Sequence, residues 1–521
     1  MKKVTRYIME AFTKKEGIPM RNAIKMRPKD NVAIAMHDMR IGEEVIDQIV
    51  AKQEIPQAHK IALEKIPKGK PVIRYGVILG YARDTILPGE WINEDSLDLP
   101  ASPDLDSLEY GLDVDEELPS PTRTSWMGYD VPNSRFAGTR NILGIQTTVQ
   151  CVVGVLQVAV NRLKEQILPQ YPNVDDIVVI RHGYGCGVAI NAPEAKVPIR
   201  TIANIMKNPN FGGQLMVVGL GCEKLTPDKI MSAKDITDDN FLLLQNYHGF
   251  EAMIEAIMKM AEKKLQVLNQ RKRVKLPLSK LAVGFQCGGS DAFSGVTGNP
   301  AAGYASDMLV KGGATTMFSE VTEVRDGVEF IARRIPDQAN CNKLIKEMSW
   351  YDNYLAQGGV DRSANPTPGN KKGGLSTIVE KSMGSIAKSG TAPIAEVVSG
   401  GEIPTKHGLI FNATPAGDFT CGPMQLASGM GVEVFVTGRG TPYNLAAAPV
   451  IKVCTRTDLK EFWHDLIDVN AGSIATGEKT LAEVGTELFE FIIDTASGKK
   501  PAAESLGLFN DLVIFNPAPM T

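Results

Sequence analysis

The pattern of apolar and polar residues divides the chain into two regions of different character. From Asn31 to Trp91, short apolar runs alternate with Pro and Gly turn signals, a spacing typical of short β-strands. After Asn141, apolar runs of strand length alternate with longer stretches of helical periodicity. The pattern therefore predicts a small all-β module followed by α/β domains built on parallel sheets.

Two amphipathic helices are predicted in the α/β region. Apolar residues recur at helical spacing between Val152 and Ile167, and again between Met253 and Leu268. The uncharged stretch from Asn141 to Asn161 has the length of a membrane span, but it contains glutamines and threonines. We interpret it as a buried strand that runs into the first helix.

An acidic segment separates the two regions. Residues 94–122 include ten acidic residues, four prolines and no Lys or Arg, a composition that cannot build a core and predicts an extended linker. The basic run at 271–275 marks a second boundary. We predict a β module at 25–93, a linker at 94–137, a middle α/β domain at 138–273 and a C-terminal α/β domain at 274–521.

Composition excludes several classes of partner. The 521 residues include 56 Lys and Arg against 60 Asp and Glu, a net charge of −4, so no basic field favours nucleic acid or a membrane surface. The first residues, MKKVTRYIMEAF, reach Glu10 without the apolar core of a signal peptide. Seven thinly spread cysteines do not suggest a disulfide framework. We expect a cytoplasmic protein that binds neither nucleic acid nor membranes.

Six predicted strands end in glycine-rich loops that carry polar and ionisable side chains. In parallel α/β sheets, ligands bind beyond the carboxyl ends of the strands. We therefore expect the six loops to share one sheet edge and to form an active site. The loops begin at His182, Gly219, Cys287, Ser319, Asn412 and Thr437.

The loop after the first of these strands does not match a nucleotide fingerprint. Val188 stands where the third glycine of GxGxxG would fall, so no nicotinamide site is expected. The sequence contains no CxxC pair, so a structural zinc ribbon is not expected. Cysteines near the expected edge are either inert core residues or ligands of iron or zinc. They are Cys151, Cys186, Cys222 and Cys287, with His182 and Glu223 beside two of them.

Carboxylates and cations also cluster in these loops. A carboxylate that directly follows a buried strand needs a metal, a proton or a cation to compensate for lost hydration. A glycine- and proline-rich loop with lysines and amides is a natural anion clamp, and an arginine offers a planar fork for a carboxylate. Each lysine alone is more often a solvated surface residue. The carboxylates are Asp291, Glu320, Glu323 and Asp418, and the candidate clamp comprises Asn370, Lys371, Lys372, Lys381 and Arg439.

Several long motifs resemble one known family. They are HGYGCGVAINAPEA, GLGCEKL, QCGGSDAFSGVTGNPAAGYASD, FSEVTEVRD, SANPTPGNKKGG, VTGRGTPY and FNPAPMT. Together they resemble the galactarate/altronate dehydratase family of hydro-lyases, from about Asn31 to Thr521. The resemblance implies a β-clip (SAF-type) N-terminal domain, a middle domain used in dimerisation, a Rossmann-like C-terminal domain without nucleotide, and dependence on ferrous iron.

The chain departs from the family pattern at a few positions. The segment from Gly128 to Asn141 differs from the usual one, Gly298 replaces an alanine, and Asn444 replaces a glycine. The catalytic edge is intact, so dehydratase chemistry is expected. Galactarate, giving 5-dehydro-4-deoxy-D-glucarate, is the expected substrate. Glucarate or altronate, or a non-catalytic sugar-acid binding protein, are the alternatives.

The implied reaction assigns roles to residues at the expected edge. A base must remove a proton α to a carboxylate, an acid must protonate the departing hydroxyl, and cations or a metal must stabilise the enolate. A mononuclear ferrous site is favoured because the cysteines lack close spacing; an iron–sulfur cluster stays open. We assign catalysis to His182, Tyr184 and Lys371, substrate binding to Arg439, Lys372, Asn370, Ser290 and Thr441, and metal ligation to members of Cys186, Cys222, Cys287, Asp291 and Glu320. A homodimer acting on a small sugar diacid is expected.

Overall fold

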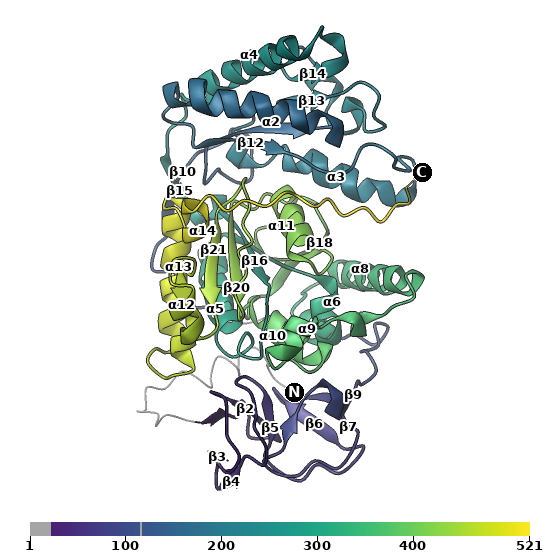
Figure 1. Ribbon diagram of the computed structural model, residues 1–521, viewed down its shortest axis with the longest axis vertical. Helices are drawn as coiled ribbons and strands as arrows, with labels where there is room; N and C mark the ends of the chain where they lie inside the picture. Colours follow the sequence, from purple (N-terminus) through teal and green to yellow (C-terminus); the bar gives the residue numbers. More distant parts are fainter. Residues whose placement is uncertain (1–21, 115–116, 521) are drawn as a thin grey trace.

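The structure, a computed structural model, describes residues 22–114 and 117–520. Its parts lie along one long axis in an order that differs from the sequence (Figure 1). The C-terminal domain occupies the centre, with the N-terminal β module at one end and the middle domain at the other. The N-terminal segment used above to argue for a cytoplasmic protein lies outside the described residues. Within the described part, no helix is both long and apolar enough to cross a bilayer.

The N-terminal module is built from short antiparallel strands, as predicted. One sheet has the order β1-β2-β5-β8, a second has the order β6-β7-β9, and β3 and β4 form a hairpin. Tight turns join the strands: Gly89 has φ +83°, and a Cβ there would lie 1.9 Å from the carbonyl oxygen of Val50. The strands are β1 (Ala23–Ile24), β2 (Val32–Ala35), β3 (Glu44–Ile46), β4 (Ile49–Val50), β5 (Lys60–Ala62), β6 (Pro71–Arg74), β7 (Val77–Ala82), β8 (Trp91–Ile92) and β9 (Leu97–Asp98).

The acidic segment after the module lies along the C-terminal domain. The carboxylate of Asp113 accepts a hydrogen bond from Nε of Arg333 at 2.8 Å, and the carbonyl oxygen of Pro103 accepts one from Arg325 at 2.9 Å. Near its end, strand β10 (Ser125–Gly128) pairs antiparallel with β15 (Val274–Pro277). Acidic groups in this segment thus meet arginines of the C-terminal domain.

The middle domain is a four-stranded parallel sheet of order β12-β11-β13-β14. The two predicted helices are confirmed as α2 (Val153–Arg162) and α4 (Phe250–Leu268), which share one apolar core with the sheet. The uncharged stretch is a strand followed by α2, as expected. The remaining elements are β11 (Ile142–Thr147), β12 (Asp176–Ile180), β13 (Val217–Gly219), β14 (Phe241–Leu243) and α3 (Lys196–Ile205).

The C-terminal domain is a seven-stranded sheet of order β18-β19-β17-β16-β20-β21-β22, with every pair parallel. Its strands are β16 (Ala282–Cys287), β17 (Thr315–Ser319), β18 (Ile394–Ser399), β19 (Gly408–Ala413), β20 (Val432–Thr437), β21 (Val450–Cys454) and β22 (Val469–Asn470). This architecture confirms the predicted fold class of a β module followed by α/β domains.

Helices surround this sheet. Helices α5 and α13 share an apolar core with strands β16, β20 and β21, and α11 lies in a separate core with residues of the middle domain. The helices are α5 (Gly298–Lys311), α6 (Val321–Val324), α7 (Val328–Ala332), α8 (Gln338–Gln357), α9 (Pro368–Lys372), α10 (Ile378–Ala387), α11 (Asp418–Ala427), α12 (Thr457–Phe462), α13 (Leu481–Ala496) and α14 (Ala502–Ser505).

The expectation that six loops share one sheet edge is wrong. The strands before His182 and Gly219 are β12 and β13 of the middle sheet, whereas the other four strands belong to the C-terminal sheet. Apolar runs identify buried parallel strands but carry no information on which sheet each strand joins. The candidate residues are therefore divided between two domains.

A buried ion triad fastens the β module to the C-terminal domain. The carboxylate of Glu380 in α10 accepts hydrogen bonds from Lys60 at 2.8 Å and from Arg74. All three side chains are almost completely buried. Lys60 also donates to the carbonyl oxygen of Gly374 at 2.6 Å. Because each charge has lost its water, each depends on the others.

We predict that Glu380→Gln destabilises the protein strongly, because it leaves the Lys60 and Arg74 charges buried without a counterion. The expected loss is about 3–5 kcal/mol in free energy of unfolding, measured by denaturant titration. Glu329→Gln, the same change at an exposed position of α7, serves as the control. A loss at Glu380 no larger than that of the control would show that the triad contributes little.

Candidate active site

Three potential metal-ligating side chains meet at the carboxyl edge of the C-terminal sheet. Cys287 ends β16, Glu320 precedes α6, and Glu323 lies within α6. One ligand atom from each lies within 4.8 Å of the other two, and no other such group of His, Cys, Asp and Glu occurs among the described residues. All three residues are buried. We call these residues the Cys287 cluster.

Two lysines of one helix neutralise this cluster. Lys381 and Lys388 are seven residues apart, two helical turns, so both face the sheet edge from α10 and its C-cap. Nζ of Lys381 lies 2.6 Å from the carboxylate of Glu323. Nζ of Lys388 lies 3.1 Å from the carboxylate of Glu320 and 3.3 Å from Sγ of Cys287. The buried cluster is thus held by ion pairs.

Burial and charge set the protonation of the cluster. Burial, and next the Glu323 charge, raise the pKa of Glu320 to about 8. Burial also raises the pKa of Glu323, but Lys381 and Lys388 outweigh it and hold that pKa below its usual value. Burial raises the pKa of the Cys287 thiol. One carboxylate is therefore charged, and the other holds a proton more readily.

The backbone of Glu320 adopts a left-handed conformation, with φ 75° and ψ 80°. A residue with a long side chain pays on the order of 1–3 kcal/mol for such a conformation. Thr414 supports it, since its Oγ1 accepts from the N–H of Glu320 at 3.2 Å and its carbonyl oxygen accepts from Val321 at 2.9 Å. The strained backbone directs the Glu320 carboxylate into the cluster.

Asp291 lies beside the cluster but is already satisfied by other donors. Its carboxylate accepts hydrogen bonds from the backbone and hydroxyl of Ser294 and from the hydroxyl of Thr455. Together with Cys287 it lines a cavity of about 10 Å³, roughly the space of one water molecule. These bonds favour a structural role for Asp291 over metal ligation, and a ligand larger than a water molecule can enter only if side chains around this cavity move.

The predicted substrate-binding residues surround the same edge. Asn370 donates to the carbonyl oxygen of Ser290 at 2.9 Å, so the lysine-bearing loop packs on the loop that follows Cys287. The backbone N–H of Arg439 donates to Gly289 of that loop at 2.9 Å, and its side chain is exposed. Lys372, which follows Asn370 closely in sequence, is exposed, and Thr441, two residues after Arg439, is partly exposed. Lys371, which was predicted to be catalytic, is partly exposed in the same lysine-bearing loop. The loops at this edge thus carry three cationic residues with solvent-exposed surface, Arg439, Lys371 and Lys372.

The β module contributes His59 to this edge. Its Nε2 lies 3.2 Å from the carbonyl oxygen of Lys372, and its Nδ1 accepts from the indole N–H of Trp91 at 3.0 Å. Because Nδ1 is an acceptor, Nε2 carries the proton and donates it. Burial lowers the pKa of His59, which favours this neutral form.

Asp418 offers a titratable carboxylate next to the cluster. It begins α11 directly after β19, and a Cβ on Gly288, next to Cys287, would lie 2.5 Å from its carboxylate oxygen. Its side chain is only partly buried. Burial, and next the charge of Glu323, raise its pKa to about 6. A carboxylate with such a pKa can accept a proton near neutral pH.

Comparison with known proteins agrees with this architecture. Residues 21–100 match the altronate/galactarate dehydratase SAF domain, 128–269 the D-galactarate dehydratase/altronate hydrolase second domain, and 278–520 the D-galactarate/altronate dehydratase C-terminal domain. The chain belongs to the galactarate/altronate dehydratase family. We refer to its N-terminal module as the SAF domain from here on.

Relatives with assigned names cover nearly the whole chain. Galactarate dehydratase (L-threo-forming) of Escherichia coli (strain K12) is 52% identical over 96% of this chain and 97% of its own length. Altronate dehydratase of Bacillus subtilis (strain 168) is 32% identical over 95% and 99%. Altronate dehydratase of Escherichia coli (strain K12) is 31% identical over 94% and 98%.

The structure does not bring the middle-domain candidates to the Cys287 cluster. His182, Tyr184, Cys186 and Cys222 follow β12 and β13, in the other sheet. His182 is buried, its Nε2 lies 2.9 Å from the carbonyl oxygen of Thr147, and burial lowers its pKa to about 4. Its ring is therefore neutral over the physiological range. Cys186 and Cys222 are exposed.

Some residues of the site were missed by the sequence analysis. Lys388 received no mention, although its spacing of seven from Lys381 within an apolar helix was a readable signal. Asp418 and Glu323 were noted as carboxylates but given no role. Ser385 donates to Glu323 at 3.3 Å and accepts from Lys388 at 2.9 Å, and only the folded structure reveals this contact.

We predict that the seven thiols react in two classes. Cys151, Cys186 and Cys222 are exposed, whereas Cys287 and the other three cysteines are buried, and the pKa of Cys287 is raised. A chromogenic disulfide reagent should modify three thiols rapidly in the native protein and the remaining four only on unfolding. Cys287→Ser should leave the fast count at three, and a fall to two would place Cys287 at the surface.

Proposed function

We propose that the protein is a hydro-lyase that removes water from galactarate to give 5-dehydro-4-deoxy-D-glucarate. The observation that carries the proposal is 52% identity, over 96% of the chain, to a relative named galactarate dehydratase. Altronate is the second candidate substrate, because two altronate dehydratases match nearly the whole chain at 31% and 32% identity. A cytoplasmic homodimer without nucleotide stays our expectation from the sequence resemblance.

The substrate is a dianion, and the edge of the C-terminal sheet offers cations to hold it. We assign one carboxylate of the substrate to Arg439, whose planar guanidinium can bind both oxygens. Lys371 and Lys372 lie on α9 beside Asn370 and are assigned to the other carboxylate. These contacts would orient the carbon that loses a proton and offset the charge that grows on its carboxylate.

Proton transfer is assigned to groups at this same edge. His182 and Tyr184 stand in the other sheet, so we propose Asp418 as the acceptor of the α-proton in their place. With a pKa of about 6, Asp418 is mostly ionised at neutral pH and still basic enough to take a proton. Burial lowers the pKa of Lys381, but Glu323 outweighs burial and holds that pKa above its usual value. Lys381 therefore stays charged and can transfer a proton to the departing hydroxyl, which leaves as water.

We further propose that the Cys287 cluster holds ferrous iron. Its donors, one thiol and two carboxylates, are of the types that bind iron. Lys388 lies close to two of them, so its ammonium group would have to give way to the ion. A bound divalent ion would act as a Lewis acid toward a substrate carboxylate. The placement of Cys186 and Cys222 in another sheet argues against one cluster shared by all three cysteines.

We predict that protein prepared anaerobically with Fe²⁺ and reductant converts galactarate into a product lighter by one water, detected by mass spectrometry. Asp418→Asn should reduce kcat by about 10²–10⁴-fold because it removes the proton acceptor. Asp228→Asn, at an exposed position of the middle domain, is the matched control and should keep activity. Absence of turnover with galactarate, glucarate and altronate would refute the proposed function.

The metal assignment predicts about one iron per chain and no acid-labile sulfide in active protein. Cys287→Ser and Glu320→Gln should both lose iron in elemental analysis. Cys341→Ser, a change at another buried cysteine, should keep it. Stoichiometric sulfide would instead indicate an iron–sulfur cluster, and iron retained by both variants would place the ion elsewhere.

A further inference from the structure

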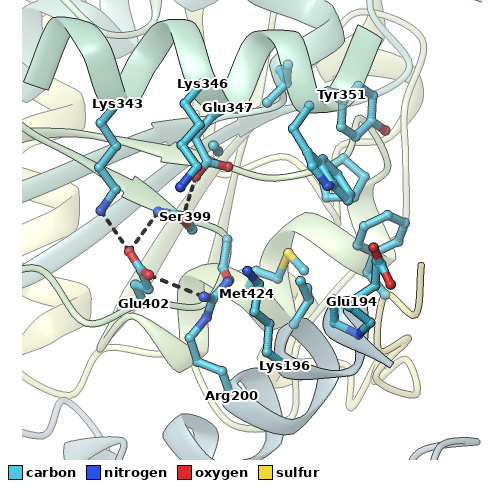
Figure 2. Close-up of a pocket in the computed structure, with 18 of the residues that line it drawn as sticks. Glu194, Lys196, Arg200, Lys343, Lys346, Glu347, Tyr351, Ser399, Glu402 and Met424 are labelled. Carbon is cyan, nitrogen blue, oxygen red and sulfur yellow. Dashed lines mark hydrogen bonds and ion pairs between the residues drawn. The ribbon is translucent and has the colours of Figure 1, made fainter. Parts of the chain in front are cut away.

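A second, larger cavity opens where the middle and C-terminal domains meet. It has a volume of about 590 Å³, within the range of small-molecule sites. In Figure 2, Lys343, Lys346, Glu347 and Tyr351 descend from α8 on one side, and Glu194, Lys196 and Arg200 rise from the opposite side. The ends of β18 and β19 contribute Ser399, Gly400 and Ala413 to its wall.

This cavity is separate from the Cys287 cluster. Neither the cluster residues nor Lys381, Lys388 and Asp418 line it. Its nearest link to the cluster is Val321, the residue after Glu320. The proposed dehydration therefore does not account for the cavity.

The wall of the cavity carries more basic side chains than its acidic side chains pair with. Glu402 is already shared by Lys343 at 2.9 Å, Arg200 at 3.2 Å and the backbone N–H of Ser399 at 3.0 Å. Within the described parts of the chain, Lys196 and Lys346 form no ion pair, although Glu194 and Glu347 also line the cavity.

Arg200 adds an unsatisfied donor. Its terminal nitrogens bond to Glu402 and to the carbonyl oxygen of Gly400, whereas its Nε is buried and has no hydrogen-bond partner. Burial lowers the pKa of this guanidinium, although the nearby carboxylates of Glu402 and Glu347 act in the opposite direction. The cavity thus has donors and positive charge to offer an incoming anion.

Aromatic rings form one wall of the same cavity. Trp350 stacks on Tyr354 with ring centroids 5.5 Å apart, and the ring of Phe515 stands nearly perpendicular to both. Trp350, Tyr351 and Phe515 line the space, and Trp350 is still 36% exposed. Flat, partly exposed aromatic surfaces pack well against another planar ring.

We propose that this cavity is a binding site for a small planar aromatic anion. The ring of the ligand would pack against Trp350 and Phe515, and its carboxylate or phosphate would meet Lys196 and Lys346. Galactarate suits this wall less well, because it is an open-chain sugar diacid with no planar ring to stack on the aromatic side chains. The site would therefore take a ligand other than the substrate.

The test uses four probes on the metal-loaded full-length protein. 2-Naphthoate and 2-naphthyl phosphate carry the same ring with different anions, 2-naphthalenemethanol is the uncharged analogue, and inorganic phosphate lacks the ring. Calorimetry gives stoichiometry and Kd, and the part of the tryptophan quenching that is lost in Trp350→Leu reports contact with Trp350. Both naphthyl anions should bind one per chain, at least about tenfold more tightly than the alcohol or phosphate. The ratio of the two Kd values identifies whether carboxylate or phosphate is preferred.

Substitutions in the wall of the cavity test whether 2-naphthoate binds there. Lys346→Met and Trp350→Leu should each weaken 2-naphthoate at least about tenfold. Lys259→Met, at an exposed position of α4, should leave Kd unchanged. Equal affinity for the uncharged alcohol, unchanged Kd in both site variants, or no binding at millimolar probe would each overturn the proposal. Displacement of 2-naphthoate by galactarate would also overturn it, by making the cavity part of the substrate site.

Discussion

The structure depends on the need to compensate three charges buried on one helix. Helix α10 carries Glu380, Lys381 and, at its C-cap, Lys388, all of them almost without solvent contact. Glu380 finds its counterions in the SAF domain, whereas the two lysines find theirs in the Cys287 cluster. Because an uncompensated buried charge is so costly, one helix sets both the position of the SAF domain and the electrostatics of the site.

This arrangement explains why the C-terminal domain lies at the centre of the molecule. It receives the SAF domain at one side of its sheet edge and meets the middle domain through the core around α11. The acidic segment that joins the outer two domains must pass along it, and Arg333 and Arg325 hold that segment in place. The acidic segment, whose composition is typical of a linker, is therefore bound along the surface of the C-terminal domain.

Local patterns were sufficient to predict much of the fold. The short antiparallel strands, the α/β character and the two long amphipathic helices follow from hydrophobic periodicity, which depends on residues close in sequence. The assignment of β12 and β13 to a separate sheet did not follow, since strand order depends on contacts between distant segments. The same limit explains His182: its position after a buried strand resembles that of Cys287, and only the sheet topology separates them.

The residues of the site were likewise predictable only in part. Cys287 was predicted as a metal ligand because thiolates suit iron or zinc, and Glu320 because a carboxylate after a buried strand needs compensation. Asp291 satisfied the same rule, yet the structure shows its oxygens occupied by Ser294 and Thr455. Sequence reasoning recognises that a buried carboxylate needs a partner, but it cannot tell which partner the fold supplies.

The separation of Lys60 from Glu380 has a consequence for synthesis of the chain. The two residues are 320 positions apart, so the SAF domain leaves the ribosome long before its counterion exists. At a typical 5–20 residues per second, that interval is roughly 15–60 s. During this interval, Lys60 and Arg74 stay hydrated on the surface of the nascent SAF domain. The surface of the SAF domain that carries Lys60 and Arg74 is therefore buried late, when this domain docks on the C-terminal domain, and not when the SAF domain itself folds.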